Sequence, residues 1–447
     1  MIGKRPETHQ VKIFETPLVS FINPNHELVK LSQSIDWNSL EKEFEVYFSE
    51  VGRPSVPIRK MVGLMLLKSL YNLSDEMVVA RWIENPYYQH FTGEYVFQYD
   101  QPMDPADFSK FRKRIGAEGA EKLLSLSIHL NKDELKGQTE VMIDSTVQEK
   151  NITFPTDVKL YRKIITRCHN LSKNYDIKLR QSYVRELKKL FLATRFMNHP
   201  KRMKEGNKAR KRIRTIGKAL VNDLQRKIPE NSLVHKDLRF YLRVLNQKRN
   251  DSNKIYSLHE PEVRCIAKGK EAKPYEFGNK SGIAKTKTGL IVGAIAFEGN
   301  PFDGHTLPEH LEQIERLTGK IFKSAIVDRG YRGRKWIGNT KIEIPGSPKP
   351  TDSYYKRSKE RKKFRQRAGI EPVIGHLKHD HRMERNFLKG VVGDSINTMM
   401  AATGYNLRHW IRKLISVLEN IIITITAILE KYISGNSVNI KSNQFAA

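Results

Sequence analysis

The sequence predicts an α/β fold, and three features of the chain support this prediction. Two short apolar runs, Val141–Ile143 and Ile326–Val327, each lead into an aspartate, which is typical of buried strands. Residues 275–285 and 289–297 are β-like segments on either side of a short turn, as in a hairpin. Segments with helical periodicity separate the strands. This order of elements favours a single sheet covered by helices.

Residues 1–135 are predicted to form a helical domain for DNA binding or dimerisation. Residues 58–71 carry the broad apolar face of a core helix, and Ser74 is placed as the N-cap of a second helix that reaches Glu84. In a basic protein, two helices across a short turn form either a DNA-binding helix-turn-helix or an ordinary helical hairpin, and both remain open. A further helix begins at Asp107. It crowds together four basic residues, which form either a solvated face or a phosphate contact: Lys110, Arg112, Lys113 and Arg114.

A basic helical insertion interrupts the predicted sheet after its first strand. Residues 157–255 hold 28 Lys and Arg against 8 Asp and Glu, so they carry +20 of the chain's net charge of +30. We interpret the insertion either as a clamp that grips DNA or as a solvated helical spacer. Its candidate DNA contacts are Arg210, Lys211, Arg212 and Arg214. The predicted domains are 1–135, the α/β domain 136–156 with 256–415, the insertion 157–255, and a carboxyl-terminal helix and tail 416–447.

The charge of the 447-residue chain points to a polyanionic partner, and nucleic acid is the commonest one. A ribosome-associated or merely basic protein is the alternative that charge alone leaves open. Two cysteines are too few for a disulfide framework or a cysteine zinc site, so we expect a reducing compartment. The amino terminus lacks the apolar core of a signal peptide. The apolar stretch 420–429 is only half a membrane span, so we expect a packed helix and no membrane partner.

Three carboxylates are candidate metal ligands. Asp144 and Asp328 end the two apolar runs, and Glu371 opens a helical segment. Two strands and a helix can thus supply oxygen ligands to a pair of Mg²⁺ ions, which clamp the attacking and leaving oxygens of a phosphodiester. The two aspartates lie side by side only if their strands are neighbours in one sheet. Taken alone, Asp144 is also explained as a residue of a strand-end turn.

The segment around Glu371 carries the most specific pattern in the chain. Phe364, Arg367, Glu371 and Lys378 match a helix pattern of Tyr, two residues, Arg, three residues, Glu, six residues and Lys, with Phe in place of Tyr. This pattern, the three carboxylates and the basic charge make the chain resemble the DDE transposases of bacterial insertion sequences. The catalytic domain of that family has the RNase H-like fold, so the resemblance implies a mixed sheet flanked by helices. The resemblance covers the amino-terminal helices, similar to that family's helical transposase domain, and residues 136 to about 410.

The resemblance implies a transposase that binds the ends of its own insertion sequence, cuts DNA strands and joins the freed 3′-hydroxyl to target DNA. It implies that Asp144, Asp328 and Glu371 hold two Mg²⁺ ions, for which Mn²⁺ can substitute. The implied partners are the double-stranded DNA of the terminal inverted repeats, the target DNA and a second copy of the chain in a homodimer. The implied location is the bacterial cytoplasm, at the nucleoid.

Basic residues near the carboxylates are candidates for holding DNA. Arg367 precedes Glu371 by one helical turn, and Lys378 follows it by seven residues on the same helix face, so both would flank a bound phosphate. The alternative for Arg367 is an ordinary exposed ion pair with Glu371. Arg329 and Arg332 follow the second apolar strand and are further candidates.

Other functions compete with transposition. A regulator or an inactive remnant would bind the ends without cutting, but it would have no use for three carboxylates. A nuclease would hydrolyse DNA without joining it, and the sequence does not separate this activity from transposition. The cluster of His376, His379, Asp380 and His381 forms either a zinc site or, as the lack of nearby cysteines favours, a solvated or phosphate-facing patch. His305 stands at a position common in these transposases, although a turn histidine explains it equally well.

Local expectations concern the surroundings of Glu371. Gly369 and Pro372 flank this residue, so we expect its helix to begin at Pro372, with Glu371 near the cap. Residues 345–363 are polar and basic, and we expect a mobile loop there. Further upstream, residues 307–317 are expected to form a helix.

Overall fold

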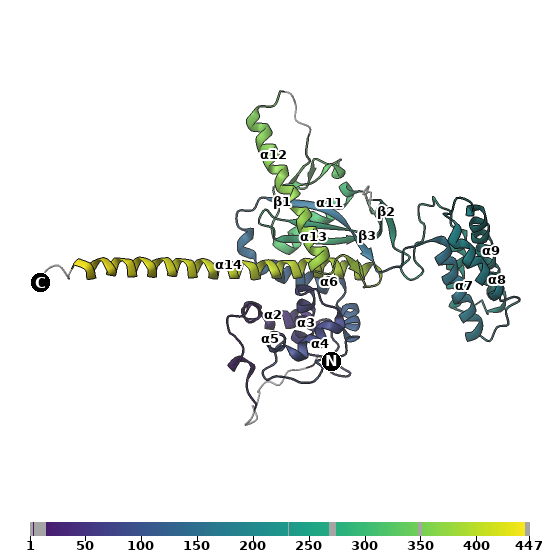
Figure 1. Ribbon diagram of the computed structural model, residues 1–447, viewed down its shortest axis with the longest axis horizontal. Coiled ribbons are helices and arrows are strands. Elements are labelled where there is room, and N and C mark those ends of the chain that lie inside the picture. The colour runs from purple at the N-terminus through teal and green to yellow at the C-terminus, as the bar shows by residue number, and fades with distance from the viewer. Residues whose placement is uncertain (1–2, 4–14, 231, 268–273, 347–350, 443–447) are drawn as a thin grey trace. The chain divides into compact units, whose positions relative to one another are not determined.

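The computed structural model describes residues 3, 15–230, 232–267, 274–346 and 351–442, with only the backbone of 417–423 and 427–442 (Figure 1). The chain forms two compact units. The first unit comprises Met1–Thr146, Lys280–Phe297 and Pro301–Ala447, and the second comprises Val147–Asn279 and Glu298–Asn300.

The amino-terminal part of the first unit is helical, as predicted. Its elements are η1 (Leu18–Ser20), α1 (Glu27–Ser34), α2 (Trp37–Glu45), α3 (Ile58–Leu70), α4 (Asp75–Glu84), α5 (Pro86–Phe91), α6 (Asp107–His129) and η2 (Lys132–Leu135). Ser74 is the N-cap of α4, because its hydroxyl accepts a hydrogen bond from the N–H of Met77 at 3.1 Å. The exposed face of α4 carries Glu76, Arg81 and Glu84, and this mixture of charges makes a poor phosphate-binding surface.

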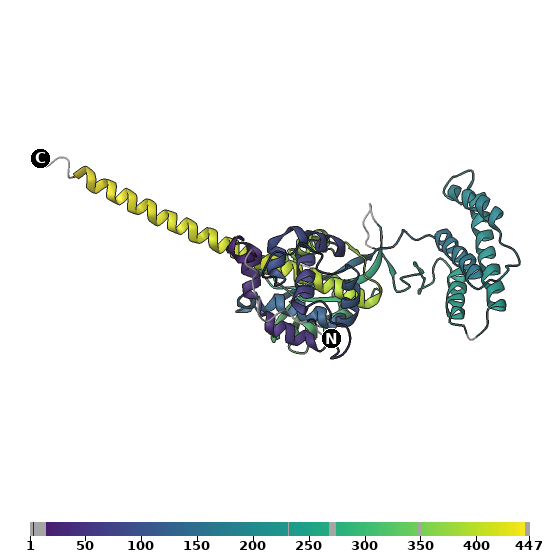
Figure 2. The ribbon, with the colours of Figure 1, turned by 90° about the horizontal axis from the view of Figure 1, so that it is seen from below.

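One apolar core joins these helices to the sheet. α3 is buried on nearly all sides and belongs to the same cluster as residues of α6, of the sheet and of α14 (Gly390–Ser442). Leu64 from α3, Leu123 from α6, Ile283 from the sheet and Leu407 from α14 are fully buried. Each such side chain contributes about 1.5–3 kcal/mol to folding. α14 is one continuous helix, as Figures 1 and 2 show.

The sheet is mixed, as predicted, and has eight strands among the described residues. They are β1 (Glu140–Lys150), β2 (Arg264–Ala267), β3 (Tyr275–Lys285), β4 (Ile291–Phe297), β5 (Ser324–Ile326), β6 (Trp336–Ile337), β7 (Thr340–Glu343) and β8 (Arg385–Asn386). Their order is β2-β3-β1-β5-β7-β6, with β4 paired to β3 and β8 paired to β1. β3 and β4 form the predicted antiparallel hairpin. In contrast, β5 runs parallel to both β1 and β7.

The remaining elements of the first unit include a helix where a loop was expected. They are α11 (Asp303–Thr318), η4 (Arg329–Tyr331), α12 (Tyr354–Ala368) and α13 (Ile370–Asp380). The expected mobile loop over 345–363 is wrong from residue 354 onward, and its residues 347–350 lie outside the described residues. Ser353 starts α12 by accepting a hydrogen bond from the N–H of Lys356 at 3.3 Å. Lys356 in turn donates to Asp352 at 2.6 Å.

The helix that carries Glu371 begins at Ile370, two residues earlier than expected. Pro372 therefore lies inside its first turn. Proline is tolerated there because its missing N–H would have no partner within the helix. The boundary with α12 is the single residue Gly369.

The second unit contains the basic insertion and folds around its own core. Its helices are α7 (Asp157–Asn174), α8 (Val184–Ala193), η3 (Thr194–Phe196), α9 (Met203–Lys227) and α10 (Val234–Asn246). Apolar side chains from all four α-helices meet, among them Leu160, Leu187, Leu220 and Leu238. The apolar periodicity of the insertion thus builds a separate hydrophobic core beneath its charged residues.

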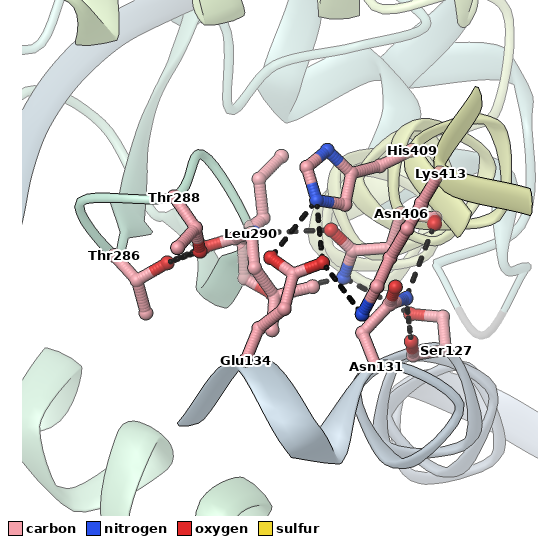
Figure 3. Close-up of polar contacts among 10 residues, drawn as sticks. Ser127, Asn131, Glu134, Thr286, Thr288, Leu290, Asn406, His409 and Lys413 are labelled. Carbon is pink, nitrogen blue, oxygen red and sulfur yellow. Dashed lines mark hydrogen bonds and ion pairs between the residues drawn. The ribbon is translucent and has the colours of Figure 1, made fainter. Parts of the chain in front are cut away.

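A polar network ties α14 to the amino-terminal helices and to the β3–β4 hairpin (Figure 3). The side chain of Asn406 donates to the carbonyl oxygen of Ile291 at 2.9 Å and accepts from its N–H at 3.0 Å. Further along α14, His409 contacts both carboxylate oxygens of Glu134 in η2 at 3.0 Å. Lys413 lies 3.4 Å from the same carboxylate. These contacts hold three distant parts of the chain together.

Within the described residues, no helix combines the length and the apolarity that crossing a membrane requires. The stretch 420–429 is helical as part of α14. Of its side chains the structure describes those of Thr424–Thr426, and all three are exposed. The packing expected for this stretch is therefore not observed at these residues.

Candidate active site

Two neighbouring strands place Asp144 beside Asp328. β1 and β5 are parallel, with Glu140 opposite Ser324 and Met142 opposite Ile326. Two residues further along, the same register sets the two aspartates opposite each other, just beyond the end of β5. The strands are therefore neighbours in one sheet, as pairing of these carboxylates requires.

A guanidinium group lies between the two aspartates. Nη2 of Arg367, from the last turn of α12, is 2.9 Å from Oδ2 of Asp144 and 3.6 Å from Oδ2 of Asp328. Nε of Arg367 is buried and has no hydrogen-bond partner among the described residues. The ion pair that Arg367 forms in this structure is thus with the aspartates and not with Glu371.

The electrostatics of the site suit a bound cation. Burial raises the pKa of Asp144; the charge of Arg367 opposes this rise, whereas the negative charges of Asp328 and Glu371 add to it. Glu371 itself is exposed in the first turn of α13. A cation relieves the cost of holding these carboxylates together, and Arg367 supplies it here. Three carboxylates are also a donor set that fits hard divalent ions such as Mg²⁺.

In the part of the chain that the structure describes, no three His, Cys, Asp or Glu side chains converge closely enough to hold a metal ion. At the candidate carboxylates, the guanidinium of Arg367 stands between the two aspartates. In the histidine cluster, His376 contacts Asp380 at 2.7 Å, whereas His381 is buried and contacts the carbonyl oxygen of Ser69 at 2.9 Å. These two histidines therefore have different partners.

Asp303 is a fourth carboxylate at the site, which sequence reasoning missed. It is the first residue of α11, which begins before the helix expected over 307–317. Its Oδ1 accepts hydrogen bonds from the hydroxyl of Ser145 at 2.7 Å and from Nζ of Lys280 at 3.0 Å. The turn-like sequence around Asp303 predicts a local bend only, because the partners of this carboxylate come from β1 and β3.

Gly330 shapes the loop that follows Asp328. Its N–H donates to Oδ1 of Asp328 at 2.8 Å. A Cβ at this position would lie 2.9 Å from the same oxygen and 3.4 Å from Oδ2 of Asp303. Glycine is therefore the residue that lets the backbone approach both carboxylates.

α12 is anchored to the sheet at a second point. Lys363 pairs with Glu140 on β1 at 3.0 Å and also with Glu343 on β7. None of the residues of α12 is buried, and its sequence holds eight basic residues against one acidic residue. Sequence reasoning missed this helix because a segment without an apolar face shows no helical periodicity.

The four basic residues at the start of α6 do not form one surface. Arg112 is buried and donates to both carboxylate oxygens of Asp75, at 3.0 and 2.7 Å. Lys110, Lys113 and Arg114 are exposed. A phosphate can therefore reach these three side chains, whereas Arg112 is held in the interior.

The other predicted DNA contacts have varied surroundings. Arg329 and Arg332 are exposed after Asp328, Lys378 is half-buried on α13, and His305 is exposed. On α9 of the second unit, Lys211 is exposed, and the other three candidates have protein partners. Arg210 lies 3.9 Å from Asp157, Arg212 pairs with Glu186 at 2.7 Å, and Arg214 donates to the carbonyl oxygen of Leu245 at 2.5 Å.

A mixed sheet with aspartates on neighbouring strands, followed by a helix with a glutamate in its first turn, defines the class of RNase H-like DDE enzymes. Comparisons with known proteins agree. The model of a transposase domain (DUF772) matches residues 17–114, and that of a transposase DDE domain matches residues 260–407. The chain belongs to the DDE transposases of insertion sequences, which are metal-dependent enzymes that act on DNA.

A relative in Rhizobium meliloti is also similar to part of the chain. This uncharacterized protein, ORF8 in the nfe locus, is 39% identical over 203 residues, which are 44% of this chain and 98% of the relative. No solved structure matches the chain significantly. Asp328 and Glu371 lie within the match to the DDE domain, and Asp144 precedes it.

Proposed function

We propose that the protein binds the ends of its own insertion sequence, cuts DNA strands there and joins the freed 3′-hydroxyl to target DNA. The observation that carries this proposal is the register of β1 and β5, which sets Asp144 beside Asp328. The influence of Glu371 on the pKa of Asp144 supports the inclusion of this third carboxylate. Both steps are phosphoryl transfers, first to water and then to the 3′-hydroxyl.

Asp144, Asp328 and Glu371 would hold two Mg²⁺ ions, for which Mn²⁺ can substitute. When bound, the metal lowers the pKa of a water molecule and neutralises charge on the phosphate in the transition state. The protein orients the carboxylates. Ser145, next to Asp144, donates to Asp303 and so restrains the middle of β1.

Arg367 and Lys378 would bind the phosphate backbone of the strand that is cut. Arg367 must then leave Asp144 and Asp328, which frees both carboxylates for metal. A guanidinium suits this exchange because it binds carboxylates and phosphates with the same forked geometry.

The basic surfaces would hold the rest of the DNA. α12 is one of them, because it carries eight basic residues and most of these are exposed. Arg329, Arg332, Lys113 and Arg114 are exposed and would add contacts. The insertion would act as a clamp, which its net charge of +20 supports. A homodimer would hold both inverted repeats together, and we place the reaction in the cytoplasm, at the nucleoid.

A strand-joining assay tests the proposal. The protein is mixed in Mg²⁺ with a pre-cut end that carries the terminal inverted repeat and with a target plasmid. A transposase is expected to yield joined product. A nuclease would yield only hydrolysed DNA, and a regulator or inactive remnant would bind the end without cutting.

The three carboxylates are tested separately with Asp144→Asn, Asp328→Asn and Glu371→Gln. Each variant is expected to lower cutting and joining by about 10³-fold or more while end binding remains, because a ligand charge is lost with little change in volume. Glu84→Gln, at an exposed position of α4, is the matched control. A variant that cuts at nearly the wild-type rate would remove its residue from the proposed metal site.

A further inference from the structure

A polar pocket lies on the flank of α13 that faces away from Glu371. Its volume is about 300 Å³, and its lining includes Tyr71, His376, His381, Tyr405, Arg408 and Arg412. His376 follows Glu371 by five residues, which turns it about 140° around the helix. This volume is at the lower end of the range for ligand pockets. The pocket is therefore separate from the candidate metal site, although the same helix contributes to both.

Arg408 is held in place before any ligand arrives. Its Nη2 donates to the carbonyl oxygen of Leu70 at 3.3 Å, and its Nη1 lies 3.6 Å from Oε1 of Glu27. The guanidinium also stands over the ring of Tyr71, 5.0 Å from the centroid. The hydroxyl of Tyr71 donates to Glu27 at 2.7 Å and so braces the same group. Such preorganisation lowers the entropy cost of binding.

Two further donors of pocket residues have no hydrogen-bond partner in the part of the chain that the structure describes. Arg412, one turn beyond Arg408 on α14, is exposed and has no hydrogen bond or ion pair with any described residue. The hydroxyl of Tyr405 likewise has no hydrogen-bond partner within the described part of the chain. Burial raises the pKa of Tyr405, and the charge of Arg412 opposes this rise.

His381 adds an acceptor. Its side chain is only 4% exposed, and its Nδ1 donates to the carbonyl oxygen of Ser69 at 2.9 Å. Burial lowers the pKa of His381 to about 4, so the ring is neutral at pH 7 and Nε2 carries a lone pair. The described residues offer Nε2 no hydrogen bond. The ring of His381 meets that of Tyr405 edge-on at 6.0 Å.

We propose that this pocket binds a phosphate group, with Arg408, Arg412 and Tyr405 donating to its oxygens. His381 accepts a hydrogen bond from a phosphate hydroxyl or from a water molecule on the phosphate. Asp380 at the rim is an acidic group of the pocket, and its carboxylate contacts His376 at 2.7 Å. Free phosphate, the 5′-phosphate of a cut strand and an internal phosphodiester share this chemistry. For the last two sources the inference rests on the proposed function.

Calorimetric titration with inorganic phosphate tests the pocket without DNA. Arg412→Gln is expected to weaken phosphate binding by about tenfold and Tyr405→Phe by a few-fold, because each removes donors to an anion. Arg53→Gln, at an exposed site before α3, is the control and should bind like the wild type. Thermal melts verify that each variant is folded.

Two binding experiments with DNA identify the source of the phosphate. End binding is compared for 5′-phosphorylated and 5′-hydroxyl oligonucleotides, and for duplexes in which single phosphates are replaced by neutral methylphosphonates. If a strand phosphate binds in the pocket, altering that phosphate is expected to weaken end binding by the wild type about tenfold. The same alteration should leave end binding by Arg412→Gln unchanged. Phosphate binding without such coupling would identify free phosphate as the ligand.

Equal phosphate binding by the wild type and Arg412→Gln, together with no coupling at any DNA position, would overturn the inference. If the protein neither binds nor joins its ends, the proposed function fails. The inorganic phosphate titration then still decides whether the pocket binds phosphate. The two failures are thus distinguishable.

Discussion

At the scale of single residues, Arg367 links metal binding to DNA binding. The same guanidinium pairs with Asp144 and Asp328 in this structure and, as proposed, with a phosphate in the DNA complex. A phosphate that draws Arg367 away leaves two carboxylates without a counter-ion. Linkage requires that DNA strengthens metal binding by the same factor by which metal strengthens DNA binding.

Removal of the Arg367 guanidinium is expected to strengthen metal binding at the carboxylates. Without DNA, Arg367→Gln should raise the affinity for Mn²⁺ by about tenfold, equivalent to ~1.4 kcal/mol, because no guanidinium competes for the aspartates. Electron paramagnetic resonance of free Mn²⁺ measures this binding and needs no catalysis. Arg365→Gln, at an exposed position of the same helix, is the control. Unchanged Mn²⁺ affinity in Arg367→Gln would contradict the exchange.

Gly330 offers a second test of the site. In Gly330→Ala, the added methyl group would meet Oδ1 of Asp328 at 2.9 Å, so the carboxylate must move. We expect strand cutting to fall by roughly 10²-fold with little change in melting temperature, because small displacements of a catalytic group are costly. Gly346→Ala serves as control, since a Cβ there meets nothing within 4 Å. Full activity of Gly330→Ala would show that the position of this oxygen is unimportant.

At the scale of elements, α14 fastens the amino-terminal helices to the sheet, and Glu134 is one of the fastening points (Figure 3). Burial acts to raise the pKa of Glu134, but hydrogen bonds from His409 and Thr288 and nearby positive charges lower it below the ordinary 4.5. A carboxylate with a lowered folded-state pKa stabilises the fold above its ordinary pKa. This contribution is lost as the pH falls through the folded-state pKa.

The loss of stability caused by Glu134→Gln is therefore expected to depend on pH. It should lower the free energy of unfolding by about 1 kcal/mol at neutral pH, and the difference from the wild type should shrink as the pH falls below the ordinary carboxylate range. Urea denaturation at several pH values measures this change, with Glu84→Gln as the exposed control. A difference that stays constant down to acidic pH would exclude the ionised carboxylate as its cause.

At the scale of the whole molecule, we propose that the insertion 157–255 can be removed while the first unit still folds. Its helices have their own core, and Lys150 and Glu260, on either side of it in the chain, form a buried ion pair at 3.3 Å. The chain therefore returns close to the point where it left the sheet. A short linker can span this distance at little entropic cost.

Replacement of residues 157–255 by a short Gly/Ser linker tests the clamp. The shortened protein is expected to fold and bind Mg²⁺ but to lose most of its salt-sensitive DNA affinity, with the log–log salt slope reduced by several units. Fluorescence anisotropy at several salt concentrations measures the slope. An unchanged slope would indicate that the insertion is only a spacer and that the first unit alone recognises the DNA ends.

Much of the architecture was predictable because its signals are local. Apolar runs predicted the strands that lead to Asp144 and Asp328, and a single hydroxyl at Ser74 predicted the start of α4. The order of these elements predicted an α/β fold, and the resemblance to the DDE transposases implied the mixed sheet. The helix α12 was not predicted because it has no apolar face. Its stability depends on contacts such as that of Lys363 with Glu140.

The sequence by itself determined the α/β class and the basic character of the insertion, since these follow from composition, periodicity and the order of elements, whereas the three carboxylates are proposed from their positions in the sequence together with the resemblance to the DDE transposases. Only the tertiary structure decided that Arg367 pairs with the aspartates, that Arg112 is buried against Asp75, and that Asp303 joins the site. The physical reason is that a charged side chain takes its partner from whatever strand or helix the fold brings within hydrogen-bonding distance. Strand order and register set that partner, and neither is encoded in the residues on either side of the charge.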